Sequence, residues 1–421
     1  MPSVVQKLPP PMNINPIVIA IPVYFLLIGI EIIYHRVHSV KSYRLKDAMT
    51  NINCGVISQI SGAFILAILF GAYTFIEANW ALFELEASWW VFPLAFVFFD
   101  MMYYWAHRMS HQINLFWAAH SVHHQSEEYN LTVALRQSST QILWTFLFYL
   151  PLALTGIPPV VFISMQGVNL LYQFWIHTES IKKLPRWYEA IFNTPSHHRV
   201  HHARNPKYID KNHAGTLIIW DKLFGTFVAE EETPTYGVTK PLSSWNPLWA
   251  NFAHYFDIWS DMKNVPKLKD KLLVLVKKPG WLPESMGGYR APKEVSERYQ
   301  KFDTNTSFRL NFYVIVQFLV IMAGTLTFLF YLDVLLDAQK ISSALIIILS
   351  VASFGLLFDN RPWSQWLEYL RILAVPLIFL YATGEFSPNL VAILIALFYL
   401  LVSAGWFTMA KKPRAVQAQL S

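Results

Sequence analysis

Eleven of the fourteen histidines in this chain lie between His107 and His213. Eight of them form three tight clusters: His107 and His111; His120, His123 and His124; His198, His201 and His202. On a helix, residues three and four positions apart lie on one face, so each cluster is expected to point its imidazoles in a single direction. Imidazole binds iron, zinc, copper and nickel. Eight convergent rings exceed what one ion usually takes, and the spacing therefore predicts a two-metal centre.

A lone histidine is usually a surface residue or a satisfied core residue, but three clusters in one region do not fit that interpretation. So many rings without a metal would repel each other whenever several were protonated near neutral pH. The single cysteine, Cys54, excludes an intrachain disulfide and a sulfur-dominated metal site. Zinc is a competing occupant because four-coordinate histidine sites also suit it. A zinc hydrolase would not need this many imidazoles, which favours iron.

Carboxylates near the clusters are candidates for orienting the ligands through their second ring nitrogen, as metal-bound histidines generally require. Asp100 precedes His107 by two helical turns, and it is either such a group or a polar core residue. Glu127, Glu128 and Glu179 follow their histidines closely and are either acceptors of this kind or surface carboxylates.

The composition is that of a membrane protein. Of 421 residues, 54% are hydrophobic and only 14% are charged, against about 25% charged in a typical soluble domain. The net charge of +6 indicates loops that face an anionic cytoplasmic leaflet. It does not indicate nucleic-acid binding, because no basic run is interleaved with exposed aromatics in a soluble domain.

Apolar runs of membrane-spanning length occur at 16–34, 55–76, 91–106, 309–332, 341–358, 367–383 and 389–409, and a run broken by proline and glycine occurs at 141–172. The broken run is expected to form a hairpin or two short spans. Basic residues follow the first run and acidic ones the second, which places the first loop and the histidines on the cytoplasmic side. The predicted fold is an all-α integral membrane protein, a multi-span helical bundle with a histidine-rich di-metal site at its cytoplasmic face.

The chain is expected to divide into four regions. Residues 1–90 form N-terminal membrane spans, and residues 91–230 form the catalytic region with the histidines. Residues 231–308 form a cytoplasmic or interfacial segment, rich in tryptophan and lysine, which is expected to lie at the level of the lipid headgroups. Residues 309–421 form the C-terminal membrane spans.

The three clusters, in this order and spacing, resemble the fatty acid hydroxylase and sterol desaturase superfamily of membrane di-iron oxygenases. The flanking sequences are similar to its alkylglycerol monooxygenase branch, and this resemblance extends nearly end to end. The segments that carry it are residues 104–109, 129–131, 134–138, 172–179, 193–202, 208–212 and 220–227.

The resemblance implies an iron-ligand set of His107, His111, His120, His123, His124, His198, His201 and His202, with His177 as a ninth ligand. Gln173 stands where hydroxylases of the superfamily have a further histidine. Gln112 stands where the alkylglycerol monooxygenase branch has a glutamate, so it is a candidate catalytic position together with Asp100 and Glu179. His213 stands where a tyrosine is expected, and we treat it as a non-ligand.

The resemblance further implies an O2-dependent monooxygenase that holds two iron ions, uses tetrahydrobiopterin and cleaves the ether bond of an alkylglycerol or a lysoalkyl phospholipid in the membrane. The expected location is the endoplasmic reticulum of a eukaryote or the inner membrane of a bacterium. One alternative is hydroxylation or desaturation of a fatty acyl or sterol substrate with a protein electron donor. An alternative of another class, a metal transporter or sensor, would favour ionisable residues along several spans, and the later apolar runs carry few.

Overall fold

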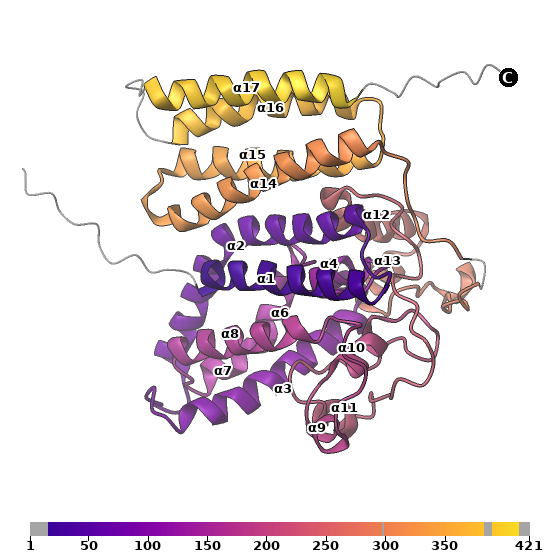
Figure 1. Cartoon of the computed structure of the whole chain (residues 1–421). Helices are drawn as coiled ribbons and strands as arrows, with labels where there is room; N and C mark the ends of the chain where they lie inside the picture. The colour runs from indigo at the N-terminus through magenta and orange to yellow at the C-terminus, as the bar shows by residue number, and fades with distance from the viewer. Residues whose placement is uncertain (1–15, 297–298, 383–389, 412–421) are drawn as a thin grey trace, which may run out of the picture.

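The computed structural model describes residues 16–296, 299–382 and 390–411, and its named elements within these ranges are all helical. The long helices lie side by side in stacked layers (Figure 1). They are α1 (Pro16–Val37), α2 (Leu45–Trp80), α3 (Val91–Gln112), α8 (Pro159–Trp175), α14 (Phe308–Phe330), α15 (Asp337–Phe358), α16 (Ser364–Ala382) and α17 (Leu390–Ala410). The all-α fold predicted from the sequence is confirmed.

Within the described residues, five helices are long and apolar enough to cross a membrane: α2, α14, α15, α16 and α17. The apolar runs predicted at 16–34 and 91–106 also form helices, α1 and α3, but these are not among the five. The protein is therefore an integral membrane protein whose apolar helices lie at both ends of the sequence, with the histidine-bearing segments between them.

The broken run at 141–172 forms the expected hairpin. Its first arm consists of α6 (Gln141–Thr145), a 3-10 turn (Phe146–Tyr149) and α7 (Leu150–Leu154), and its second arm is α8. Gly156 makes the turn with a φ of +85°, and a Cβ there would lie 1.9 Å from the carbonyl oxygen of Phe83. Only glycine fits both the left-handed backbone and this close approach.

Helices α14 and α15 pack on α2, and α16 and α17 pack on α14 and α15 as an outer layer (Figure 1). Ile57 and Ile60 of α2 lie in the same buried cluster as Val351 and Phe354 of α15. This bundle also encloses an ion pair between Glu368 and Arg371, both fully buried. Their remaining hydrogen bonds go to Tyr313, Gln317, Ser353 and Tyr399. Charged groups persist in an apolar bundle only when paired and hydrogen-bonded in this way.

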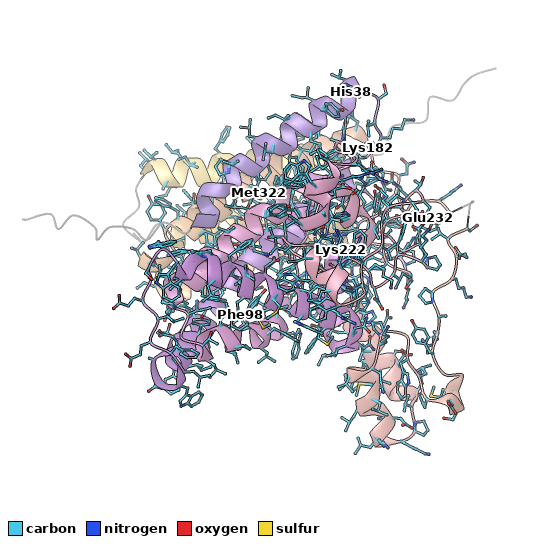
Figure 2. The ribbon with its side chains drawn as sticks, turned by 90° about the horizontal axis from the view of Figure 1, so that it is seen from below. His38, Phe98, Lys182, Lys222, Glu232 and Met322 are labelled. Carbon is cyan, nitrogen blue, oxygen red and sulfur yellow. The ribbon has the colours of Figure 1, made fainter. Side chains whose placement is uncertain are left out.

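The shorter helices gather at one end of the long ones, on the right in Figure 1. They are α4 (Asn114–His124), α5 (Leu131–Ala134), α9 (Arg186–Ile191), α10 (Pro195–His202), α11 (Ile219–Leu223), α12 (Pro247–Asn264) and α13 (Leu268–Val276), with a 3-10 turn at Glu284–Met286. A further 3-10 turn, Leu332–Val334, joins α14 to α15 at the opposite end of the bundle. His38, Lys182, Lys222 and Glu232 all lie at the same end as the shorter helices (Figure 2). The polar part of the molecule is therefore concentrated at one end of the bundle.

Helices α12 and α13 present apolar side chains to the outside of this polar end. Phe256 and Trp259 of α12 are 57% and 66% exposed, and Leu268 and Leu272 of α13 are 73% and 55% exposed. Lysines flank both helices. This exposure supports the prediction that residues 231–308 lie at the headgroup level, where an amphipathic surface is stable.

Candidate metal centre

Four segments deliver the predicted ligand histidines to one place. His107 and His111 lie on the last turns of α3, and His177 follows the end of α8. The other six lie on two short helices, α4 (His120, His123, His124) and α10 (His198, His201, His202). Helix α10 begins with Pro195, whose fixed φ and missing N–H suit the first turn of a helix. The predicted helical faces are therefore present.

The nine histidines divide into two groups, and within each group the ligand nitrogens all lie within 4.8 Å of one another. The first group, with five rings, is His107, His111, His120, His124 and His201. The second group, with four rings, is His123, His177, His198 and His202. All nine side chains are buried. Two adjacent all-nitrogen groups are an arrangement suited to two metal ions.

The structure divides two of the sequence clusters between the groups. Helix α4 contributes His120 and His124 to the first group and His123 to the second, whereas α10 contributes His201 to the first and His198 with His202 to the second. The sequence clusters therefore do not each form one group. Instead, α4 and α10 each contribute to both groups and so fix their relative position.

Backbone carbonyls orient the rings through their second nitrogen. Nδ1 of His107 donates to the carbonyl of His213, at 2.7 Å, and Nδ1 of His201 to that of Lys211, at 2.9 Å. In the second group, Nδ1 of His123 donates to the carbonyl of Arg136. Nδ1 of His177 donates to the carbonyl of Gln173. Metal-binding histidines generally use such acceptors, which fix the tautomer and leave Nε2 for the metal.

The contacts between Nε2 atoms are a test of whether the residues fit a metal. In His123 and His177 the proton is on Nδ1, because a carbonyl oxygen can only accept, yet their Nε2 atoms are 3.2 Å apart. Burial lowers the pKa of His123 to about 4, so this ring is neutral. Two bare lone pairs at this distance repel each other unless a cation lies between them. Two nitrogens bound to one ion at about 2.1 Å would be about 3.0–3.4 Å apart, so the residues fit a metal.

Asp100 acts on the loop that follows α10 and not directly on a histidine. Its oxygens accept from the backbone N–H groups of Thr216, at 2.8 Å, and Leu217, at 2.9 Å, and from the indole of Trp220. That loop also contains His213, whose carbonyl holds His107. Asp100 therefore supports the loop whose backbone orients His107.

Gln112 is connected to the first group by Asp210, which contacts both Gln112 and His111. Its amide donates to Oδ2 of Asp210 at 3.2 Å, and Oδ1 of Asp210 lies 3.5 Å from Nδ1 of His111. Lys278 contacts the same carboxylate at 3.3 Å. Asp210 is thus the carboxylate next to His111, and Gln112 is one of its hydrogen-bond donors. The sequence did not indicate Asp210, because it lies 99 positions from His111 and in a loop.

We expect the substitution Asp210→Asn to lower the metal affinity of the first group about 10–100-fold, because partners of ligand histidines typically contribute that much. Metal titration of the purified apoprotein measures this. The matched control is Lys278→Gln, which removes an exposed partner of the same carboxylate and should change the affinity less than about threefold. Equal affinities for Asp210→Asn and the wild type would remove Asp210 from this role.

Glu179 and the two glutamates after α4 do not contact the ligand nitrogens in the described structure. Glu179 accepts from the hydroxyl of Tyr236, at 3.1 Å. Glu128 accepts from Arg44 and Lys301, at 2.5 and 2.6 Å. Glu127 accepts from the backbone of Phe302 and from Tyr299. Glu127 and Glu128 therefore connect the end of α4 to residues 299–303.

Two buried residues that the sequence did not indicate support the second group. The side chain of Arg136 donates to the carbonyl of Val122 and to Gln125, at 2.6 and 2.8 Å. These bonds hold in place the backbone carbonyl of Arg136, which accepts from His123. Glu31 of α1 accepts from the backbone of Leu131 and from the hydroxyl of Thr178, which follows His177. An acid inside an apolar run is the signal that could have identified Glu31.

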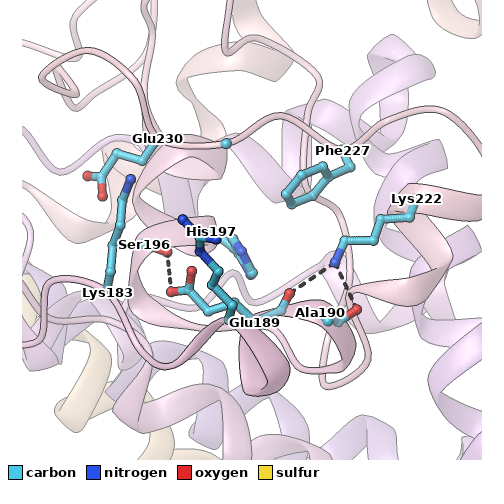
Figure 3. Close-up of a pocket in the computed structure, with 10 residues that line it drawn as sticks. Lys183, Glu189, Ala190, Ser196, His197, Lys222, Phe227 and Glu230 are labelled. Carbon is cyan, nitrogen blue, oxygen red and sulfur yellow. Dashed lines mark hydrogen bonds between the residues drawn. The ribbon is translucent and has the colours of Figure 1, made fainter.

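A pocket of about 230 Å³ lies beside this centre, lined by Lys183, Arg186, Glu189, Ala190, Ser196, His197, Lys222, Phe227, Ala229 and Glu230. Lys222 donates to the carbonyls of Glu189 and Ala190, and Ser196 donates to the Glu189 carboxylate (Figure 3). His197 is the only histidine that lines it, and burial lowers its pKa to about 4. The pocket is a polar recess next to α10 and contains no member of either metal group.

Comparison with known proteins agrees with this geometry. Residues 92–226 match the fatty acid hydroxylase family model, and residues 310–399 match the alkylglycerol monooxygenase C-terminal domain. The chain is 43% identical to the alkylglycerol monooxygenase of Homo sapiens over 354 residues, covering 82% of this chain and 77% of that protein. It belongs to the alkylglycerol monooxygenase family. The member from Danio rerio is 39% identical and covers 88% of this chain and 83% of its own.

Members of the alkylglycerol monooxygenase family thus share both the catalytic region and the C-terminal helices with this chain. The ornithine lipid hydroxylase OlsE of Rhizobium tropici is 30% identical over 135 residues, which cover only 32% of this chain. No solved structure matches the chain. The family and the apolar helices establish a membrane monooxygenase, an oxygen-dependent oxidoreductase, with histidine groups that can bind metal.

Proposed function

We propose that the protein is a di-iron monooxygenase that cleaves the ether bond of alkylglycerols in the membrane. Oxygenation of the carbon next to the ether oxygen gives a hemiacetal, which collapses to a fatty aldehyde and a glycerol derivative. The names of the curated relatives support this substrate class. A lysoalkyl phospholipid carries the same ether bond and belongs to the same class of substrates. The two electrons would come from tetrahydrobiopterin.

The observation that carries the proposal is the pair of buried all-nitrogen groups, with five and four imidazoles. Iron bound there would supply the activation of O2. Backbone carbonyls orient four of the nine rings: those of His213 and Lys211 accept from His107 and His201 of the first group, and those of Arg136 and Gln173 accept from His123 and His177 of the second. The buried histidine side chains would keep bulk water away from a bound metal and so limit side reactions there.

The proposed orientation places the active site at the cytoplasmic face, of the endoplasmic reticulum in a eukaryote or of the inner membrane in a bacterium. The loop between α1 and α2, which lies at the histidine end, carries Lys41 and Arg44. The loop between α2 and α3 carries Glu84 and Glu86 and lies at the opposite end. An excess of Lys and Arg in short loops is typical of the cytoplasmic side.

Product analysis tests the proposed function. The iron-loaded protein is incubated with a 1-O-alkylglycerol, O2 and tetrahydrobiopterin, and fatty aldehyde is measured. We expect aldehyde that depends on both the pterin and O2. An iron-loaded protein that releases none, and instead hydroxylates or desaturates a fatty acyl or sterol substrate with a protein electron donor, would contradict the proposal.

A metal transporter or sensor is the alternative from another class. It would be indicated by iron uptake into sealed vesicles without any oxidised lipid. The two histidine groups lie at one end of the bundle, and the buried ionisable pair of the C-terminal helices, Glu368 with Arg371, is fully hydrogen-bonded. Among the described residues, this arrangement gives no path of ionisable groups along several helices, as a transporter would favour.

A further inference from the structure

The polar pocket beside α10 is lined by cations that have no anionic partner. Lys183, Arg186 and Lys222 all contribute to its lining. Among the described residues, none of the three takes part in an ion pair, and Lys222 donates instead to two backbone carbonyls, at 3.0 and 2.8 Å (Figure 3). Three cations around one recess raise the local concentration of anions. The pocket therefore has the charge of an anion site.

The two carboxylates in the lining do not cancel this charge. Glu230 accepts two hydrogen bonds from the guanidinium of Arg199, both at 2.7 Å, and is neutralised by it. Glu189 accepts from the backbone N–H of Leu184, at 3.0 Å, and from the hydroxyl of Ser196, at 2.9 Å. Three cations thus face one carboxylate that already has its donors, and the pocket keeps an excess of positive charge.

A buried nitrogen in the lining indicates that the pocket receives a polar group. His197 lines the pocket and is only 4% exposed, and its Nδ1 has no hydrogen-bond partner of normal geometry. Buried polar atoms in native structures nearly always have a partner. In one tautomer of the neutral ring this nitrogen is a donor, which suits an anionic oxygen. The volume of about 230 Å³ accommodates a phosphate group and the few atoms attached to it.

Exposed apolar side chains next to the cations indicate the source of such a phosphate. Helix α9 places Trp187 beside Arg186, and α11 places Leu223 beside Lys222. Trp187 is 69% exposed and Leu223 is 68% exposed. Both helices lie at the polar end of the bundle (Figure 1). Tryptophan together with lysine and arginine at this level is typical of segments in contact with lipid headgroups, whereas a water-soluble phosphate needs no exposed apolar side chains.

We propose that this pocket binds the phosphate group of an anionic glycerophospholipid. The three cations neutralise the phosphate, while Trp187 and Leu223 contact the glycerol and acyl part of the same lipid. The site is separate from the metal centre and does not depend on the proposed ether cleavage. Because Ser196 and His197 of the lining belong to α10, the bound lipid also holds the helix that contributes to both histidine groups.

Binding of short-chain lipids to the purified full-length protein in detergent tests the proposal. The probe is dihexanoyl phosphatidic acid, compared by calorimetry with dihexanoyl phosphatidylcholine and with glycerol 3-phosphate. We expect the wild type to bind phosphatidic acid more tightly than either. Lys183→Gln and Arg186→Gln should each weaken this binding about fivefold, and the double variant about 25-fold, because each cation at a headgroup contributes about that much. Neither side chain makes a hydrogen bond to the protein in the described structure, so the fold should be unaffected.

The matched control is Lys240→Gln, which also removes one positive charge. Lys240 is 78% exposed, pairs with Asp257 and does not line the pocket, so its loss should change the affinity less than about twofold. Trp187→Ser should weaken binding of phosphatidic acid but not of glycerol 3-phosphate. Equal affinities of the wild type and the double variant for phosphatidic acid would overturn the site. Glycerol 3-phosphate bound as tightly as phosphatidic acid would overturn the lipid assignment.

Discussion

Replacing His198 by alanine is expected to abolish turnover and to remove the metal of the second group while the membrane helices stay folded. Nε2 of His198 lies 3.0 Å from that of His177 and 3.2 Å from that of His202, so it connects the other rings of a four-ligand site. Removing the hydrogen-bond partner of a ligand histidine lowers metal affinity about 10–100-fold. Removing a ligand itself should lower the affinity further. Iron content should fall from about two to about one per chain.

The neighbouring residue provides the control for this prediction. His197 is also buried on α10, but it lines the polar pocket and belongs to neither group. His197→Gln should retain both irons, as measured by metal analysis, with helicity by circular dichroism as the check on folding. The same loss of turnover is expected for alanine at His111, His123 and His201. Full activity in any of these variants would remove that residue from the ligand set.

Replacing Asp100 by asparagine is expected to destabilise the protein by about 2–4 kcal/mol and to weaken metal binding. The carboxylate accepts from two backbone N–H groups and one indole, and hydrogen bonds to a charged group contribute about 1.5–3 kcal/mol each. Asparagine keeps the shape but turns one acceptor into a donor that faces N–H groups. The loop with Thr216 then shifts, and with it the carbonyl of His213 that orients His107.

Thermal unfolding and iron titration measure these two effects of Asp100→Asn. The control is Asp257→Asn, which removes an acid whose partner, Lys240, is 78% exposed. A surface pair of this kind contributes at most about 1 kcal/mol. If Asp100→Asn left both the unfolding temperature and the iron affinity unchanged, Asp100 would have no positioning role.

The helices that carry the site could be predicted because their signals, residue spacing and turn residues, are local in the sequence. Histidine spacings of three and four placed the rings on helical faces, and Gly156 with Pro158 and Pro159 marked the hairpin. Both predictions agree with the structure. The apolar runs likewise matched the helices, although α1 and α3 are not among those of spanning character.

The parts that the sequence could not predict depend on contacts between distant segments. Spacing puts His120, His123 and His124 on one helix, but the packing of α4 on α3 and its ring contacts with α10 decide which group each ring joins. The acceptors that fix the tautomers are backbone carbonyls, which every residue has and no sequence pattern marks. Asp100 was expected either to orient a ligand or to be a polar core residue, and only the structure shows that its partners include groups at positions 216–220. Such pairings follow from tertiary structure alone.

The connection between Glu127, Glu128 and residues 299–303 has a consequence for biogenesis. All nine group-forming histidines are synthesised by residue 202, about a hundred positions before Lys301 and Phe302 reach the end of α4. Until then Glu128 at that end lacks one of its two cationic partners, and Glu127 lacks the N–H of Phe302. A ribosome-bound chain therefore carries α4 without the late contacts that fix the segment following it. Iron insertion should accordingly be a late event, accomplished on a nearly full-length chain.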